Sequence, residues 1–378
     1  VTASDQSRLQ SRWTSNDASN VAGETALQLI VTGTANAALT AIDNNVLDAS
    51  GNGMQVGMQG GGQVAALLRN NLFLSIGDDA ADRGLVITSE PESNGSITVL
   101  ADNNNFDTIS GDGLVVSLDG TSTGSFTIIN NFFTGTNTLG GAAAALLQNV
   151  AGSTSAIQTT LHDNQVIGSS GDAYRLTQQD GVLALSTTNG NTPHQQLATT
   201  NIGTPIVVTG SVTPIASDAL DAERLLLVGD LAWIDEDGDG IRQTMEATLP
   251  FATLHLTGTE TDSSAMVQRT TVTDATGRYL FGALFSGIYT LSYEPALGLK
   301  VALANQGDDD TLDSDFSQST GTVTVTLTAD DVSLDLGVLR TWQNPRTRLD
   351  VNNDGLVTSN DVLRLINDIN NNNRQTPL

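Results

Sequence analysis

The strongest constraint on the fold of this chain is an internal repeat with a period of 60 residues. The motif at 44–53, Asn-Asn-Val followed by Gly-Asn-Gly, returns in closely similar form at 104–113 and 164–173. A second motif, Asn-Asn before two apolar residues, lies at 70–73 and again at 130–133. Such regularity predicts stacked structural units rather than a single globular core. The predicted corner residues, spaced alternately by 26 and 34 residues, are Asn44, Asn70, Asn104, Asn130 and Asn164.

A parallel β-helix fits these spacings, because one of its turns takes roughly 20–30 residues. An asparagine at each corner can stack on its neighbours through the amide, and it tolerates the left-handed backbone of a corner. The two longer loops are expected at 75–83 and 134–141. An Asn/Gly-rich β-sandwich with accidental periodicity is the alternative, and the unbroken period disfavours it. Strands are expected at 54–57, 85–88, 114–118, 142–147 and 173–176.

The Asn-x-apolar corners followed by short strands resemble the repeats of right-handed, pectate-lyase-like parallel β-helices, over roughly residues 20–200. Many such folds bind or cleave polysaccharide. Gly77-Asp78-Asp79 is similar to the paired aspartates of polygalacturonases, but their Gly-His-Gly and Arg-x-Lys motifs are absent. His162 is interpreted as a surface histidine, and this part contains no lysine to act as a base. We therefore expect a docking or stalk role here and no catalysis.

The amino-acid composition excludes some classes of function. Acidic residues outnumber basic ones by 42 to 15, and the net charge is −27, so no basic patch can neutralise nucleic-acid phosphates. The acidity has two interpretations, a solvated surface or divalent-cation binding. The chain has no cysteine to form disulfides, which makes metal ions useful staples. No apolar run approaches the ~20 residues of a membrane span.

The stretch 226–250 carries the spacing of a calcium loop. Carboxylates recur at alternate positions, Gly240 permits a sharp turn, and a glutamate at the twelfth position can close the coordination shell. The predicted Ca²⁺ ligands are Asp235, Asp237, Asp239, the carbonyl of Ile241, and Glu246.

Short alternating strands with turn signals between them predict an antiparallel sandwich around this loop. A tight hairpin turn is expected at 274–277, and Tyr279, Phe281 and Tyr289 are expected to be core aromatics. The strands are expected at 225–228, 252–257, 267–273, 278–281, 284–291, 322–327 and 332–338.

The motifs Gly-Asp-x-x-Trp-x-Asp-x-Asp-Gly-Asp-Gly-Ile, Thr-Asp-x-x-Gly-x-Tyr-x-Phe and Leu-x-x-Gly-x-Tyr resemble the SdrD-type B domain of surface adhesins. These are calcium-braced modules related to the Cna-type B modules. The resemblance covers about residues 226–340 and implies an immunoglobulin-like or prealbumin-like sandwich that serves as a rigid stalk. Gln243 departs from the family, which usually has an acidic residue there. Lys300 lies late in the module, so we expect no isopeptide cross-link.

An acidic loop at 308–315 holds five carboxylates within eight residues and no basic residue. Such charges repel one another unless a cation lies among them. The family resemblance implies a second calcium region here, in the Asp-Ser-Asp at 313–315, and we expect the loop to be ordered only with metal. A solvated acidic loop is the alternative. The predicted ligands are Asp308, Asp313 and Asp315, with Asp310 in addition.

A second calcium-loop spacing lies at 350–361, followed by apolar residues at helical spacing from 362 to 369. Residues 348–370 resemble one half of a type I dockerin, an EF-hand-like module, which implies a cohesin-like partner. A full dockerin has two such halves and one is visible here. The end of the chain, from Asn370 to Leu378, is expected to be disordered. The predicted ligands are Asp350, Asn352, Asp354, Leu356 and Asp361.

The sequence thus predicts a mainly β chain: β-helix repeats at 1–205, a connector at 206–225, a calcium-binding sandwich at 226–340, and a dockerin-like half at 341–378. We expect a mature or excised piece of a secreted or cell-surface bacterial protein, with calcium as its cofactor, a structural or adhesive role, and no enzymatic activity. The alternative is a protein that binds or degrades extracellular polysaccharide through the β-helix groove. Assembly into a fibre or surface layer through stacked β-helix ends is a further option.

Overall fold

The computed structural model describes residues 2–3, 8–23, 25–216, 225–261, 264–296, 298–340, 349–351 and 356–370. The chain forms two compact units, Val1–Leu225 and Leu226–Leu378. Within the described residues, no helix combines the length and apolar character needed to cross a bilayer. The expected order of a parallel β-helix, then a sandwich of mainly antiparallel sheets, then a short helix is confirmed.

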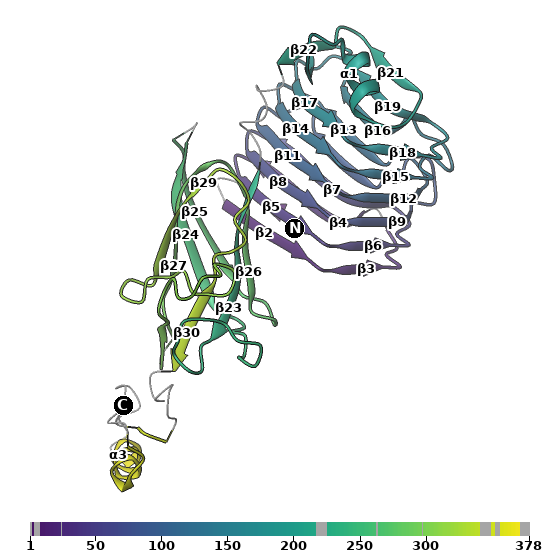
Figure 1. The fold of residues 1–378 in the computed structure, drawn as a ribbon. Coiled ribbons are helices and arrows are strands. Elements are labelled where there is room, and N and C mark those ends of the chain that lie inside the picture. The colour runs from purple at the N-terminus through teal and green to yellow at the C-terminus, as the bar shows by residue number, and fades with distance from the viewer. Residues whose placement is uncertain are drawn as a thin grey trace. The chain divides into compact units, whose positions relative to one another are not determined.

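The first unit is a solenoid whose coils stack in three parallel sheets (Figure 1). The first sheet contains β1 (Thr2–Ala3), β4 (Thr25–Gly33), β7 (Asn52–Gly60), β10 (Leu85–Ser89), β13 (Leu114–Leu118), β16 (Ala143–Asn149), β19 (Asp172–Thr177) and β21 (Ile206–Thr209). The second contains β2 (Arg8–Thr14), β5 (Asn36–Ile42), β8 (Gln63–Arg69), β11 (Ser96–Asp102), β14 (Thr123–Ile129), β17 (Ala156–His162), β20 (Val182–Thr187) and β22 (Thr213–Ala216). The third contains β3 (Asp17–Ser19), β6 (Asn45–Leu47), β9 (Leu72–Ile76), β12 (Asn105–Ile109), β15 (Phe132–Thr134) and β18 (Gln165–Ile167).

The expected asparagine ladder exists, but it does not run through all the predicted residues. At each corner the amide nitrogen donates to the side-chain oxygen of the asparagine one coil later, at 2.8–3.0 Å. Asn70 and Asn130, which we predicted as members, lie one residue before it. The members are Asn16, Asn44, Asn71, Asn104, Asn131, Asn164 and Asn201.

Except at Asn201, which follows helix α1, the residue before each ladder asparagine has the left-handed backbone that the sequence assigns to the ladder itself. Its φ is 55° at Asp43, 56° at Asn70, 53° at Asn103 and 57° at Asn130. Asparagine and aspartate tolerate this region better than other non-glycine residues. At each such corner, one residue turns the backbone, and the asparagine that follows it makes the amide contact between coils.

Apolar side chains fill the solenoid interior in columns. Phe73, Phe106 and Phe133 stack with ring centroids 4.8 and 4.7 Å apart, and all three are buried. A Cβ atom on Gly53 would lie 2.7 Å from the Phe73 ring. The second glycine of the repeat motif is therefore needed because the phenylalanine column occupies the space of a side chain.

The solenoid continues beyond the boundary expected at residue 205. Helix α1 (Pro193–Thr200) begins with a capping box between Thr192 and Gln195, and Leu197 is buried against the coils. β21 and β22 then extend both large sheets, because 206–209 and 213–216 pair in parallel with β19 and β20. The connector thus begins later than predicted, since its apolar residues complete a last coil.

The second unit contains a sandwich of two four-stranded sheets around one core, where Tyr279, Phe281 and Tyr289 are buried as predicted. The hairpin turn at 274–277 also forms, with Gly277 N donating to Asp274 O at 3.0 Å. One sheet has the order β26 (Arg278–Leu284), β23 (Leu226–Ile234), β30 (Leu336–Arg340) and β28 (Leu299–Val301). The other has the order β25 (Met266–Val272), β24 (Thr253–Glu260), β27 (Gly287–Tyr293) and β29 (Thr322–Leu327).

One strand pair departs from the antiparallel expectation. β30 pairs in parallel with β23, matching Ala232 with Leu336 and Ile234 with Val338. The strand expected at 332–338 starts four residues later, at Leu336, because the preceding residues form a turn in which Asp331 accepts hydrogen bonds from Ser333. The first and last strands of the module are therefore neighbours. After them, the described chain ends in helix α3 (Ser359–Asn370).

The asparagine ladder allows a direct test of the solenoid. Asn104 donates to Leu68 O and Asn131 and accepts from Asn71, all in the buried interior. Asn104→Ala should lower the free energy of unfolding by about 3 kcal/mol, because buried backbone groups lose partners. Asn103→Gly removes an exposed amide and keeps the left-handed turn, so its loss should stay below about 1 kcal/mol. Equal losses in chemical denaturation would contradict the ladder.

Candidate metal centres

The first acidic loop begins where β23 ends. Asp235 is 1% exposed, and its two carboxylate oxygens accept from Gly238 N at 2.6 Å and Gly240 N at 2.9 Å. Both glycines have positive φ, 78° and 80°. A Cβ atom on Gly240 would also lie 2.5 Å from Leu303 O. The loop therefore wraps around the first carboxylate, as the Asp-x-Asp-x-Asp-Gly pattern requires.

Glu246 closes this loop through its side chain. One carboxylate oxygen accepts from Glu236 N at 2.7 Å and the other from Gln243 N at 2.9 Å. Asp235, Asp237 and Glu246 each offer one carboxylate oxygen to a group whose atoms lie within 4.8 Å of one another. Such a set of hard oxygen donors fits a divalent cation.

Asp239, also a predicted ligand, makes its hydrogen bonds within the loop. Its carboxylate accepts from Ile241 N at 2.8 Å and from the side-chain amide of Gln243 at 2.9 Å. Asp239 is not part of the three-carboxylate group. Gln243 is uncharged, and its contact with this loop is the hydrogen bond that orients Asp239. Ile241 forms a backbone bridge with Asp313, and nothing in this arrangement assigns its carbonyl to a metal.

The charges in this loop favour cation binding. Burial raises the pKa of Asp235 and of Glu246, and the nearby carboxylates raise both further, against hydrogen bonds from backbone N–H groups that lower them. A divalent cation among these oxygens would relieve both the repulsion and the loss of solvation. The residues present thus fit a resident metal ion.

The second acidic loop gathers three of its predicted carboxylates. Oxygens of Asp310, Asp313 and Asp315 lie within 4.8 Å of one another. Asp308, also predicted, is not part of this group. Asp309 instead forms a local turn, because its carboxylate accepts from Thr311 N at 3.1 Å and Thr311 Oγ1 at 2.7 Å, which lowers its pKa.

A residue that sequence reasoning missed lies beside this loop. Asp335, just before β30, has its backbone N–H 2.6 Å from Asp315 Oδ2, and Asp315 N donates in return to Asp335 O at 2.9 Å. Burial raises the pKa of Asp315 to about 7 and that of Asp335 to about 8. The available signal was a lone aspartate among the apolar residues 334–339, which is unusual in a buried strand.

The two acidic loops are joined through their backbones. Ser314 N donates to Gly240 O at 3.1 Å, and Arg242 N donates to Leu312 O at 2.6 Å. Together with the bridge between Ile241 and Asp313, these bonds form a short ladder between the loops. These bonds hold the backbones of the two loops side by side.

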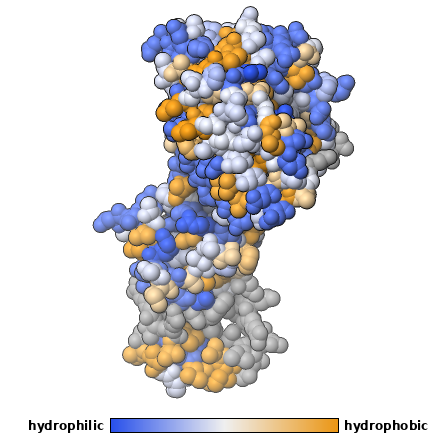
Figure 2. Space-filling model, turned by 90° about the vertical axis from the view of Figure 1, so that its right-hand side faces the viewer, coloured by the Kyte–Doolittle hydropathy of each residue, from blue (hydrophilic) through white to orange (hydrophobic). Residues whose placement is uncertain are grey.

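The C-terminal loop is described only in part. Asp350 and Asp361 are buried, and Asp361 accepts from Thr358 N at 2.7 Å at the start of α3. Leu356 is exposed, while Asn352 and Asp354 lie outside the described residues. Helix α3 presents an apolar surface, which is part of the apolar area at the lower end of Figure 2. Its exposed apolar residues are Val362, Leu363, Leu365 and Ile366.

Two polar features lie on the surface of the solenoid. Asp78, Asp79 and Asp82 form an exposed acidic turn, in which Asp82 Oδ2 accepts from the backbone N–H groups of the other two at 3.0 and 3.1 Å. These bonds explain the turn without a ligand. His162 pairs with the adjacent Asp163 at 2.6 Å on the surface, as expected of a surface histidine.

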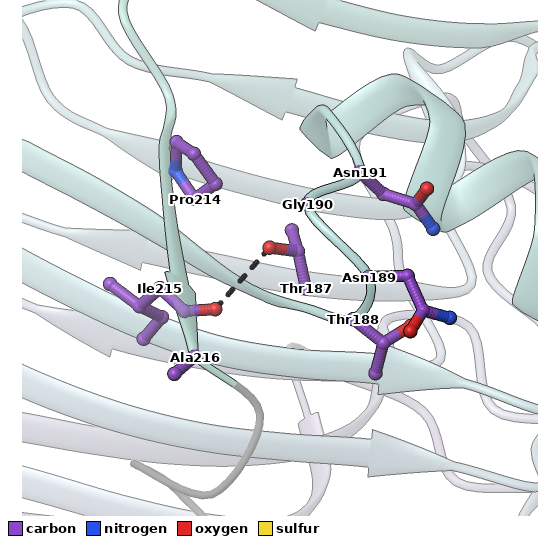
Figure 3. A pocket seen from close by; sticks show the side chains of 8 residues that line it. All are labelled: Thr187, Thr188, Asn189, Gly190, Asn191, Pro214, Ile215 and Ala216. Atoms are coloured by element: carbon purple, nitrogen blue, oxygen red, sulfur yellow. Dashed lines mark hydrogen bonds between the residues drawn. The ribbon is translucent and has the colours of Figure 1, made fainter.

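A depression of about 600 Å³ lies at the last coils of the solenoid (Figure 3). Its lining carries hydroxyl, amide and apolar groups, and Thr187 donates across it to Ile215 O at 3.4 Å. Among the described residues that line it, none is acidic, basic or a histidine. The lining residues are Thr187, Thr188, Asn189, Gly190, Asn191, Pro214, Ile215 and Ala216.

The buried carboxyl groups predict an inverted pH dependence for the metal-free protein. Asp315 and Asp335 keep their protons up to pH about 7 and about 8 when folded, whereas the unfolded chain loses them near 3.8. The stability that these two groups contribute is then fully present below pH 3.8, falls by up to about 1.4 kcal/mol per pH unit for each group above that pH, and is lost once the pH has risen through 7 and 8. Calorimetry after removal of divalent ions should show this fall, and Asp315→Asn should reduce it. Metal-free stability that rises between pH 5 and 8 would contradict the assignment.

Comparison with known proteins agrees with the geometry of the second unit. Residues 226–338 match the model of the SdrD B-like domain family. Serine-aspartate repeat-containing protein E of Staphylococcus aureus (strain USA300) is 34% identical over 147 residues, which are 37% of this chain and 12% of that protein. Bone sialoprotein-binding protein of Staphylococcus aureus (strain MRSA252) matches with the same identity and coverage. The matched region thus spans only a small part of the length of these relatives. The similarity to the SdrD B-like domain lies in residues 226–338, as the motifs in that stretch predicted.

Proposed function

We propose that this chain is part of a secreted or cell-surface bacterial protein, in which residues 226–340 form a calcium-stiffened stalk module. The observation that carries the proposal is the convergence of Asp235, Asp237 and Glu246 in a loop with the twelve-residue calcium spacing. Calcium prefers oxygen ligands in flexible arrangements of this kind. The match of the same residues to a domain of staphylococcal proteins supports the surface role.

The strand order supports a stalk. β23 and β30 are the first and last strands of the sandwich, and they pair in parallel. A pull on the two ends along the strands therefore loads their hydrogen bonds together, rather than opening them one at a time. β23 runs directly into the first acidic loop, and Asp235 N donates to Val338 O at 2.8 Å. A cation in that loop would fix the junction of the two load-bearing strands.

The solenoid fits a spacer or docking role in the same protein. Its coils are held by buried amides and apolar columns, which make a rod whose length is set by the number of coils. Adhesion to a surface partner is then the function of the whole. The cohesin-like partner implied by the dockerin resemblance stays a prediction, and the exposed apolar residues of α3 are the surface on which such a partner would bind.

A second candidate function is polysaccharide binding by the solenoid. The observation that favours it is the depression in Figure 3, whose hydroxyl and amide groups can hydrogen-bond to sugar hydroxyls. Binding to a glycan array without release of sugars would support this function. Release of reducing or unsaturated sugars from acidic polysaccharide would instead support degradation.

Calcium bracing predicts a melting shift that one carboxylate controls. Calcium at 100 times its dissociation constant should stabilise the second unit by about 2.7 kcal/mol, and a chelator should remove that gain. Asp237→Asn should remove the part of the gain that this loop supplies, because it deletes one of the three converging carboxylates. Asp237 is exposed, so its loss leaves the buried Asp235 turn intact. Asp79→Asn, in the exposed turn of the solenoid, is the matched control and should leave the gain unchanged. Equal gains in both variants would refute bracing by this loop.

Order in the second acidic loop should also depend on metal. Residues 306–316 carry a cluster whose repulsion a cation would offset. Limited proteolysis should cut this segment at least several times faster with chelator than with calcium, and mass spectrometry of the fragments locates the cuts. Cleavage at 78–82 serves as the internal control, since that turn is closed by its own hydrogen bonds. Equal cleavage of 306–316 in both conditions would point to a merely solvated loop.

A further inference from the structure

The solenoid contains three Asn-Gly pairs, at 52–53, 94–95 and 189–190. An asparagine in this position can lose its side-chain amide, because the nitrogen of the next residue attacks the amide carbon and a glycine has no Cβ atom to obstruct the approach. The attack requires a glycine nitrogen that is free of hydrogen bonds and a backbone that can rotate at the pair. The structure distinguishes the three pairs by these requirements.

Two of the pairs are held by hydrogen bonds between coils. Asn52 begins β7, where its side-chain oxygen accepts from Arg83 N at 2.9 Å and Gly53 N donates to Arg83 O at 2.9 Å. In the pair at 94–95, Gly95 N donates to Gly60 O at 3.2 Å. Each of these glycine nitrogens is engaged with a neighbouring coil, so a reaction there must first break bonds that hold the solenoid together.

The third pair lacks such bonds. Asn189 and Gly190 lie in the turn between β20 and α1 (Figure 3), and both residues are exposed. Within the part of the chain that the structure describes, neither Gly190 N nor the Asn189 side chain takes part in a hydrogen bond. A Cβ atom on Gly190 would have no neighbour within 4 Å, so the space around the pair is open to water.

Hydrogen bonds hold the two ends of this turn and leave its tip unrestrained. Asn191 N donates to Thr188 O at 2.9 Å, and the buried Gln196 side chain accepts from Thr188 N and from the Asn191 amide, both at 3.0 Å. Asn189 and Gly190 lie between these anchors, with left-handed φ values of 53° and 72°. The pair is therefore able to rotate into the geometry of the attack while β20 and α1 stay in place.

We propose that Asn189 is a site of spontaneous deamidation. The Gly190 nitrogen gives up its proton and bonds to the side-chain carbonyl carbon of Asn189, which expels ammonia and closes a cyclic imide. A water molecule then opens the ring at either of its carbonyl groups and leaves an aspartate or an isoaspartate. The exchange of a neutral amide for a carboxylate adds a negative charge to the depression in Figure 3, whose described lining residues carry none. The reaction is independent of the proposed calcium function.

Incubation of the whole chain in mildly alkaline buffer, followed by peptide mapping with mass spectrometry, tests this site. Asn189 should deamidate at least about tenfold faster than Asn52 or Asn94, because only those two pairs must first break hydrogen bonds between coils. In concentrated urea the fold no longer separates the pairs, so the three rates should become similar. Similar rates in the folded protein, or an equally large preference for Asn189 in urea, would overturn the proposal.

Two variants give an independent readout by isoelectric focusing. Asn189→Asp keeps a residue that tolerates the left-handed turn and starts with the added charge, so the more acidic form that accumulates in the unchanged protein should no longer appear. Asn94→Asp is the matched control at another exposed Asn-Gly pair, and it should accumulate a more acidic form at the unchanged rate. Accumulation in Asn189→Asp as fast as in the unchanged protein would place the reaction elsewhere and refute the assignment.

Discussion

Polar groups that a chain buries at its corners must find partners there, and both units of this protein are organised by that requirement. In the solenoid the partner is supplied by the next coil. The amide of Asn71 donates to Asn104 and to Ala41 O, and the same pattern repeats from coil to coil. In the sandwich the buried corner groups are carboxylates, which repel one another and cannot satisfy each other in the same way. The asparagine ladder of the first unit is therefore satisfied by its own hydrogen bonds, whereas the crowded carboxylates of the second unit are the reason for proposing a cation there.

The repeat architecture could be predicted because each coil must make the same corner and the same contacts with its neighbours. The strand positions expected at 85–88 and 114–118 fall in β10 and β13, and the period follows from stacking. The assignment within the Asn-Asn pairs could not be made, because both residues of a pair recur with the same period. What separates Asn70 from Asn71 is which side chain points inward after the backbone turns at the left-handed residue.

The candidate metal centres also combine features that the sequence predicted with features that it did not. Spacing within one loop predicted that Asp235, Asp237 and Glu246 converge, since twelve consecutive residues suffice to close the loop. Asp239 follows the same spacing, yet its carboxylate accepts a hydrogen bond from the side-chain amide of Gln243. The resembled family usually has an acidic residue at the position of Gln243, and the spacing pattern did not predict this hydrogen bond. Asp335 was not predictable from spacing, because it reaches the acidic loop through the pairing of β30 with β23.

That pairing also explains why the acidic loops lie where they do. β23 leads into the first loop, and the second loop reaches the start of β30 through Asp315 and Ser314. Backbone bonds from Ser314 to Gly240 and from Arg242 to Leu312 then connect the two loops. The crowded carboxylates thus surround the place where the first and last strands of the module meet. In the proposed stalk, a divalent ion there would act on the contact between these two strands, which must hold under load, and its removal would weaken that contact rather than the sheet formed by β25, β24, β27 and β29.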